Sequence, residues 1–223
     1  MFVEDVLLSK YSNYKIGGPA GSFFEAKKVD EIGKALNMWR QTAIKIRQDK
    51  NAIFILGAGT NILFDDKGYD GLIIKPKIEF IKKEGRDNLV LRVGAGVLTR
   101  DLLNYLIPKN LSGLEWAGGL PGTLGGAIRG NAGAFGGEIK DIVKEVISLD
   151  ISGRKPKIIK RSASKCLFGY RSSIFKINKN KEIIIEVVLV FKKGDSGAIK
   201  SVVEQNINYR KERQWTHFLF FLK

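Results

Sequence analysis

Two glycine-rich stretches contain the residues best suited to hold a ligand through the protein backbone. The first, LGAGTNIL (56–63), directly follows a short apolar run. Gly57 and Gly59 let successive N–H groups converge on an anion, and Thr60 and Asn61 add side-chain hydrogen-bonding groups beside them. The loop lacks the third glycine of a dinucleotide-binding turn and the Gly-Lys-Ser/Thr ending of a phosphate loop. A tight strand-to-strand turn remains the alternative for this loop alone.

The second stretch, GLPGTLGGAIRGNAGAFGG (119–137), has too much glycine for an ordinary helix or strand. Pro121 stiffens it and Thr123 can cap a short turn. A mobile linker is the alternative, but flexible linkers are usually polar and serine-rich, whereas apolar residues interrupt this stretch. We expect its backbone to lie against something large and polyanionic, with its N–H groups turned inward.

Composition limits the classes of function. The chain has 223 residues and a net charge of +15, which favours anionic partners or, alternatively, only a solvated basic surface. The single cysteine, Cys166, lies among apolar neighbours and is expected to be a small buried side chain. A single cysteine cannot form an intrachain disulfide. With only one histidine and two methionines besides, we also expect no metal site. No apolar run is long enough to span a bilayer, so we expect a cytoplasmic protein without a membrane partner.

Interleaved strand and helix patterns must position these loops. Asp30 and Thr99 are expected to cap two helices, the second ending at Pro108, and Ser196 is expected to cap a third. The helices and strands do not alternate regularly, which favours an α+β fold. Strands are predicted at residues 22–27, 52–57, 72–75, 89–94, 142–150 and 182–192.

Four stretches together resemble the UDP-N-acetylenolpyruvoylglucosamine reductase (UDP-N-acetylmuramate dehydrogenase) family. They are NYKIGGPA (13–20), ILGAGTNILFDDKGYDG (55–71), GLEWAGGLPGTLGGAIRGNAGAFGGE (113–138) and FGYRSSIFK (168–176). The resemblance implies a cytoplasmic flavoenzyme with the two-subdomain FAD-binding fold of the vanillyl-alcohol oxidase (PCMH) type. It predicts one FAD-binding subdomain over residues 1–75, a second over 76–195, and a helix with a divergent tail over 196–223.

The same resemblance implies FAD as cofactor and NADPH as hydride donor. The first glycine loop would hold the FAD pyrophosphate, and the second would lie against the cofactor. The residues expected to bind FAD are Gly57, Ala58, Gly59, Thr60, Asn61, Ile62, Leu63, Gly119, Pro121, Gly122, Thr123, Gly125, Gly126, Asn131 and Gly133.

Arg171 matches the arginine of the family's Tyr-Arg-x-Ser-x-Phe-Lys motif. In the family, NADPH reduces FAD, the flavin passes hydride to the enolpyruvyl double bond of a UDP-sugar, and this arginine stabilises the charge that develops beside the carboxylate. A guanidinium suits that role because it is always charged and can grip a carboxylate in a fork. Considered alone, Arg171 could be a surface ion pair. Tyr170 is expected to bind substrate, or else to be a core aromatic.

The sequence departs from the family pattern after NYRKERQ (208–214). The family continues to a Ser-Ala-Gly-Ser-x-Phe-Lys segment, whereas this chain reads WTHFLFFLK (215–223). We therefore expect a C-terminally shortened member, in which the family's proton-donor serine and its assisting glutamate have no counterpart. His217 lies in this tail and is given no role.

Several functions remain in competition. The first is flavin-dependent reduction of the UDP-sugar in peptidoglycan precursor synthesis, by a monomer that binds no nucleic acid. The second is a non-catalytic FAD-binding module, and the third is another oxidoreductase of the same fold. Covalent attachment of the flavin in the third is disfavoured because the one histidine lies outside every FAD motif. A nucleic-acid binder ranks last, because the basic residues are dispersed and no nucleic-acid motif is present.

Overall fold

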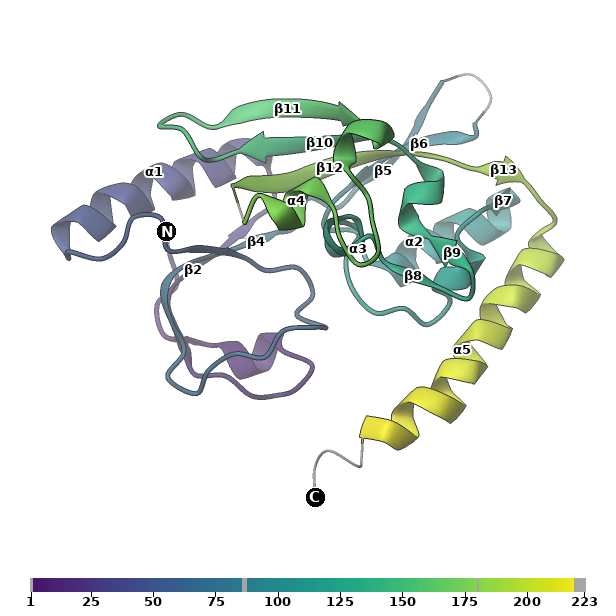
Figure 1. Cartoon of the computed structure of the whole chain (residues 1–223), viewed down its shortest axis with the longest axis horizontal. Coiled ribbons are helices and arrows are strands. Elements are labelled where there is room, and N and C mark those ends of the chain that lie inside the picture. Colours follow the sequence, from purple (N-terminus) through teal and green to yellow (C-terminus); the bar gives the residue numbers. More distant parts are fainter. Residues whose placement is uncertain (1, 86–87, 180, 219–223) are drawn as a thin grey trace.

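The computed structural model describes residues 2–85, 88–179 and 181–218. Two main sheets organise the chain (Figure 1), and the first has the order β1-β2-β4-β3. Strand β1 is antiparallel to β2, whereas β2, β4 and β3 run parallel. The strands of this sheet are β1 (Val6–Leu7), β2 (Pro19–Ala26), β3 (Ile53–Ile55) and β4 (Tyr69–Pro76).

The second sheet is antiparallel throughout and has the order β11-β10-β12-β6-β5. Its strands are β5 (Ile81–Glu84), β6 (Val90–Gly94), β10 (Val143–Asp150), β11 (Lys157–Ser162) and β12 (Glu182–Val190). Two short antiparallel pairs complete the strands: β7 (Leu111–Ser112) with β13 (Lys192–Lys193), and β8 (Gly133–Ala134) with β9 (Gly137–Glu138). Every predicted strand is therefore confirmed.

Helices cover both sheets. In Figure 1 the second sheet lies along the top, with α1 and the first sheet at the left and α2, α3 and α5 at the right. The α-helices are α1 (Val29–Lys45), α2 (Thr99–Leu106), α3 (Leu124–Gly130), α4 (Ile174–Ile177) and α5 (Ser196–Phe218). The 3-10 helices are η1 (Leu8–Tyr11), η2 (Ile107–Lys109), η3 (Glu115–Ala117), η4 (Ile139–Ile142) and η5 (Ala163–Cys166).

One apolar core joins the two sheets. Trp39 of α1 packs in a buried cluster that includes Leu72 and Ile74 of β4 and Ile147 and Ile183 of the second sheet. The opposite face of the second sheet packs against α2 and α3 in a larger cluster. Such burial is the main favourable contribution to folding. Because one of these clusters contains residues from both sides of the predicted boundary, the division at residue 75 stays a prediction.

Three helix starts differ from the sequence prediction, whereas Thr123 caps α3 as expected. The Glu31 carboxylate, not that of Asp30, accepts the N–H groups that precede α1. Thr99 is already helical, and its hydroxyl donates to a carbonyl of the second glycine loop. At the start of α5 the acceptor is the Asp195 side chain and not Ser196. At α1 and α5 a neighbouring carboxylate therefore accepts the free N–H groups in place of the expected cap, whereas no side chain caps α2.

Candidate cofactor site

A pocket opens between the first sheet, the second sheet and α3. Its empty space is about 500 Å³, including the opening to solvent. The residues that line it come from both glycine loops, from α4 and from the second sheet, among them Leu56, Gly57, Thr123, Gly126, Phe175 and Ile184. The two predicted cofactor loops therefore meet at one pocket. They touch directly, because a Cβ at Gly57 would lie 2.9 Å from Thr123 Oγ1 and a Cβ at Gly122 would lie 3.4 Å from Thr60 Oγ1.

The first glycine loop presents a run of unused backbone donors. Among the described residues, none of the backbone N–H groups from residue 57 to residue 61 donates a hydrogen bond to another group of the chain. Gly59 has a φ of 69°, and a Cβ there would lie 1.6 Å from the Tyr11 carbonyl oxygen, so only glycine fits. Converging N–H groups of this kind form an anion-binding concavity. The loop thus has the unpartnered donors that an anion site requires.

Three carbonyl groups of the same loop accept hydrogen bonds from neighbouring segments of the chain. Lys75 Nζ donates to the Gly57 carbonyl at 2.7 Å, the Asn13 N–H donates to the Gly59 carbonyl at 3.1 Å, and Ser12 Oγ donates to the Ile62 carbonyl at 2.9 Å. Residues 12 and 13, where the NYKIGGPA stretch begins, and Lys75 of β4 therefore hold this loop in place. Of the other residues predicted here, Asn61 and Leu63 are exposed, and Ala58 is half-buried.

The second glycine loop behaves differently from the expectation. The N–H groups of Leu124 and Gly125 donate to the carbonyls of Val97 and Ala95, and that of Gly126 donates to Thr123 Oγ1. The prediction of inward-turned N–H groups is therefore wrong for this turn, because the start of α3 satisfies its donors within the protein. Gly126 itself is exposed at the pocket, and a Cβ there would contact only Thr123 Oγ1, at 3.4 Å.

Several glycines of this loop allow other parts of the chain to approach. A Cβ at Gly119 would lie 3.0 Å from Arg210 Cδ of α5, and one at Gly125 would lie 3.0 Å from Ala95 Cβ. A Cβ at Gly133 would lie 2.8 Å from Glu138 Cγ. Packing within the protein thus largely explains the glycine content of residues 119–137, which we call the belt. Pro121 is exposed between these contacts.

Asn131 is a buried connector between the belt and the FGYRSSIFK motif. It ends α3 in the left-handed region, with a φ of 43°. Its Nδ2 donates to Glu138 Oε2 at 3.2 Å and to the Gly169 carbonyl at 3.0 Å, and its Oδ1 accepts from the Lys140 N–H at 3.3 Å. The Asn131 side chain therefore holds protein segments together.

Arg171 lies on the surface near this connector, outside the pocket. Its φ of 51° turns the chain sharply, and its carbonyl accepts a 2.9 Å hydrogen bond from Lys176 Nζ. After hydrogen bonds from Lys140 and Asn131, the Arg171 charge helps to lower the pKa of Glu138. Arg171 makes no salt bridge within 4 Å to any described residue, so the ion-pair alternative is not supported.

Tyr170 points into solvent with an exposed fraction of 88%. The core-aromatic alternative is therefore wrong. The Arg171 guanidinium lies 6.0 Å from the centre of the Tyr170 ring, which keeps the two side chains together.

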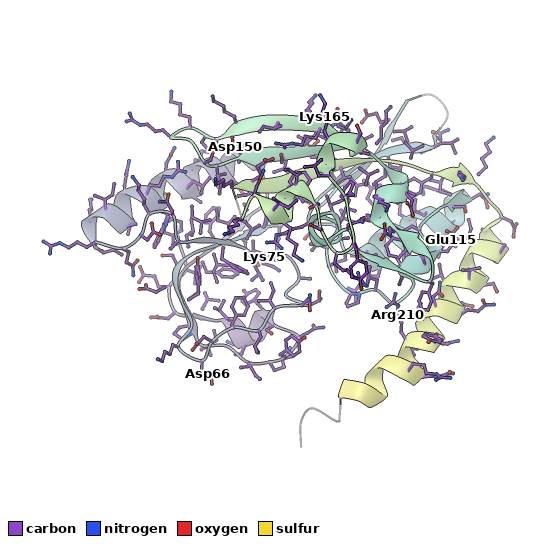
Figure 2. The ribbon with its side chains drawn as sticks, viewed as in Figure 1. Asp66, Lys75, Glu115, Asp150, Lys165 and Arg210 are labelled. Carbon is purple, nitrogen blue, oxygen red and sulfur yellow. The ribbon has the colours of Figure 1, made fainter. Side chains whose placement is uncertain are left out.

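Helix α5 packs against the belt through Arg210, which Figure 2 labels beside it. Arg210 is buried, its Nε donates to the Gly118 carbonyl at 2.8 Å, and its guanidinium lies 5.0 Å from the centre of the Phe135 ring. Burial, followed by the nearby charge of Arg171, lowers the pKa of Arg210. The tail residues 215–223, including His217, lie beyond the side chains that the structure describes.

Sequence reasoning missed the buried polar group in the pocket wall. Glu182 of β12 lines the pocket, accepts a 2.8 Å hydrogen bond from Arg161 Nη2, and accepts another of 2.6 Å from Ser148 Oγ. Lys75 was also missed, although its place in the apolar strand GLIIKP marks it as an unusual charge. Cys166 is buried as predicted, and burial raises the pKa of its thiol to about 11.

The fold and the pocket define an FAD-binding domain, and the family model described as "FAD binding domain" matches residues 22–155. Cholesterol oxidase from Brevibacterium sterolicum shares the fold, with a TM-score of 0.62 at 13% identity over 86% of this chain and 38% of that chain. The expected α+β, FAD-binding fold of the vanillyl-alcohol oxidase type is confirmed. No helix among the described residues is long and apolar enough to cross a membrane.

Proteins with higher sequence identity to this chain identify its family within the class of FAD-binding proteins. A UDP-N-acetylenolpyruvoylglucosamine reductase from Alkaliphilus metalliredigens is 36% identical over 97% of this chain and 67% of its own length, and one from Clostridium novyi is 33% identical over 95% and 64%. The crystal structure of the Thermus caldophilus enzyme matches with a TM-score of 0.75 at 25% identity, over 95% of this chain and 70% of that one. The chain belongs to the UDP-N-acetylenolpyruvoylglucosamine reductase family and spans about two thirds of the length of these curated relatives.

Proposed function

We propose that this chain binds FAD and takes part in the NADPH-dependent reduction of UDP-N-acetylglucosamine enolpyruvate to UDP-N-acetylmuramate. One observation carries the proposal: five consecutive N–H groups, those of residues 57–61, have no partner in the described chain, and they begin at Gly57 in the wall of a pocket where two sheets meet. The named relatives support the choice of substrate. Bound FAD would supply the group that accepts hydride from the nicotinamide and passes it to the substrate.

The residues of the pocket would divide the work of holding FAD. The N–H groups of the loop from Gly57 to Asn61 suit a pyrophosphate, and Thr123 and Gly126 form the facing wall. The apolar surfaces of Phe175 and Ile184 suit a planar ring. We retain the other predicted FAD-binding residues as proposals, with Asn131 and Gly119 acting through the shape of the belt.

Arg171 is the proposed catalytic residue. Its exposed guanidinium has no described salt-bridge partner, so it is available to grip a carboxylate in a fork. A fixed charge of this type stabilises negative charge that develops in a transition state, an effect worth about 10²–10³ in rate. Tyr170 is proposed to contact the substrate, because its exposed ring lies beside this guanidinium.

We also propose that the protein acts as a monomer in the cytoplasm, in peptidoglycan precursor synthesis. The expected ligands support this place, since nicotinamide nucleotides and UDP-sugars are polar anions that a chain of net charge +15 attracts.

The proposal is tested by loading the purified chain with FAD and adding reagents anaerobically. We expect noncovalent FAD, bleaching of its absorption by NADPH, and only slow substrate-dependent recovery of colour, which Arg171→Ala should slow further. A chain that takes up no FAD contradicts the whole proposal. A chain that binds FAD but is never bleached supports the non-catalytic module instead.

A further inference from the structure

We infer that Lys75 is a positioning residue for the anion-binding loop: its ammonium fixes the Gly57 carbonyl at the rear, so that the following N–H faces the phosphates. The inference rests on the proposed placement of the FAD pyrophosphate at residues 57–61. Figure 2 labels Lys75 in the middle of the molecule, where the first sheet approaches the second.

The sheet register brings Lys75 to the loop. Strands β3 and β4 run parallel with Ile55 opposite Ile74, so Lys75 is one residue further along, beside the point where the chain leaves β3. Its Nζ then reaches the Gly57 carbonyl at 2.7 Å. The hydrogen bond therefore joins the loop to the strand that adjoins it in the sheet.

The direction of one peptide unit connects this contact to the ligand. In a trans peptide, the N–H points opposite to the carbonyl of the same unit. Because Lys75 holds the Gly57 carbonyl, the Ala58 N–H must point away from the ammonium, and it has no partner within the described chain. Without this donor the carbonyl would be free to turn toward the ligand, where its oxygen would repel an anion.

The Lys75 ammonium makes no salt bridge within the described chain, because Glu25, which lies opposite Lys75 on β2, pairs with Lys77 instead. The side chain is half-buried, and burial lowers its pKa, although the more distant carboxylates of Glu25 and Glu79 oppose that effect. No carboxylate of a described residue lies within 4 Å of its Nζ, and its one described hydrogen bond is to a neutral carbonyl. Buried charges are normally paired. A pyrophosphate bound in front of the loop would supply the missing negative charge.

Lys77 provides a matched control two residues further along the chain. Its ammonium carries the same charge, but it pairs with Glu25 at 2.8 Å and makes no described contact with the loop. Lys75→Met and Lys77→Met therefore remove the same charge and keep a similar side-chain length. Lys75→Arg keeps the charge and a donor.

The experiment measures dissociation constants for FAD by flavin fluorescence, and for ADP and adenosine by competition with FAD or by calorimetry. Lys75→Met should weaken binding of FAD and of ADP by about ten- to a hundredfold and leave adenosine unchanged, since adenosine has no phosphate. Lys77→Met should change none of the three by more than about twofold. Lys75→Arg should restore most of the affinity.

Thermal unfolding without ligand separates positioning from folding. A purely structural lysine would lower the melting temperature and weaken ADP and adenosine by the same factor, which would overturn the inference. Unchanged FAD and ADP affinities in Lys75→Met would also overturn it. If the wild-type chain binds ADP but not FAD, the proposed function fails, and the ADP and adenosine comparison still decides the role of Lys75. If it binds neither, both are wrong.

Discussion

A single methyl group added at Gly126 tests whether the pocket holds the cofactor. Gly126 is exposed in the pocket wall, and a Cβ there would meet only Thr123 Oγ1, at 3.4 Å. Gly126→Ala should therefore fold normally. Because alanine favours a helix more than glycine does, the variant should gain up to about 1 kcal/mol of stability, or about 2–4 °C in melting temperature.

The same methyl group would occupy space that FAD needs. Extra volume in a well-packed contact costs about 1–3 kcal/mol, which corresponds to about a five- to 150-fold weaker affinity. Gly130→Ala is the matched control, because Gly130 lies in the same helix, has nothing within 4 Å of its Cβ position and does not line the pocket. It should gain similar stability and bind FAD as the wild type does.

The assay combines thermal unfolding of the FAD-free chain with fluorescence titration by FAD. Higher stability together with weaker FAD binding in Gly126→Ala, but not in Gly130→Ala, is the expected pattern. Equal FAD affinity in both variants would refute the placement of the cofactor against the start of α3. Packing within the protein would then be the whole explanation for the glycine content of the belt.

Further predictions concern other parts of the chain. Glu182→Gln should lower the free energy of unfolding by about 3–5 kcal/mol in urea titrations, because it removes the buried anion of the pair and leaves the half-buried Arg161 guanidinium without it; a loss below 1 kcal/mol would contradict this. Asn131→Ala should cost about 1–3 kcal/mol by the same measurement, since its side chain holds two segments and its φ is left-handed. The thiol of Cys166, whose pKa burial raises from 9.0 to about 11, should resist alkylation at pH 8 until the chain is unfolded. Between pH 9.0 and about 11 the thiol keeps its proton in the folded chain and loses it in the unfolded chain, so the free energy of unfolding should fall as pH rises through this range. Cys166→Ala should remove this contribution to the pH dependence of the free energy of unfolding. Arg171→Lys should restore only part of the turnover lost in Arg171→Ala while FAD binding stays unchanged, since an ammonium cannot form the guanidinium fork.

The local sequence contained enough information to predict most elements. Apolar runs with β-branched residues predicted the strands, and the helical spacing of Ile32, Leu36 and Trp39 agrees with the buried face of α1. Helix starts were less predictable. Asp30 and Ser196 are good caps by type, yet Glu31 and Asp195 accept the hydrogen bonds, because a shift of one residue changes which side chain reaches the N–H groups.

The sequence by itself also determined the family and the two glycine-rich loops that meet at the pocket, because glycine is needed where φ is positive or backbones meet, as at Gly59. Only the tertiary structure decided what each glycine approaches. Gly125 and Gly119 make room for Ala95 and for Arg210 of α5, contacts between residues far apart in the chain or in separate elements. The contact of Lys75 with the first loop could not be predicted from the sequence either, because it depends on the register of two parallel strands and not on any local pattern.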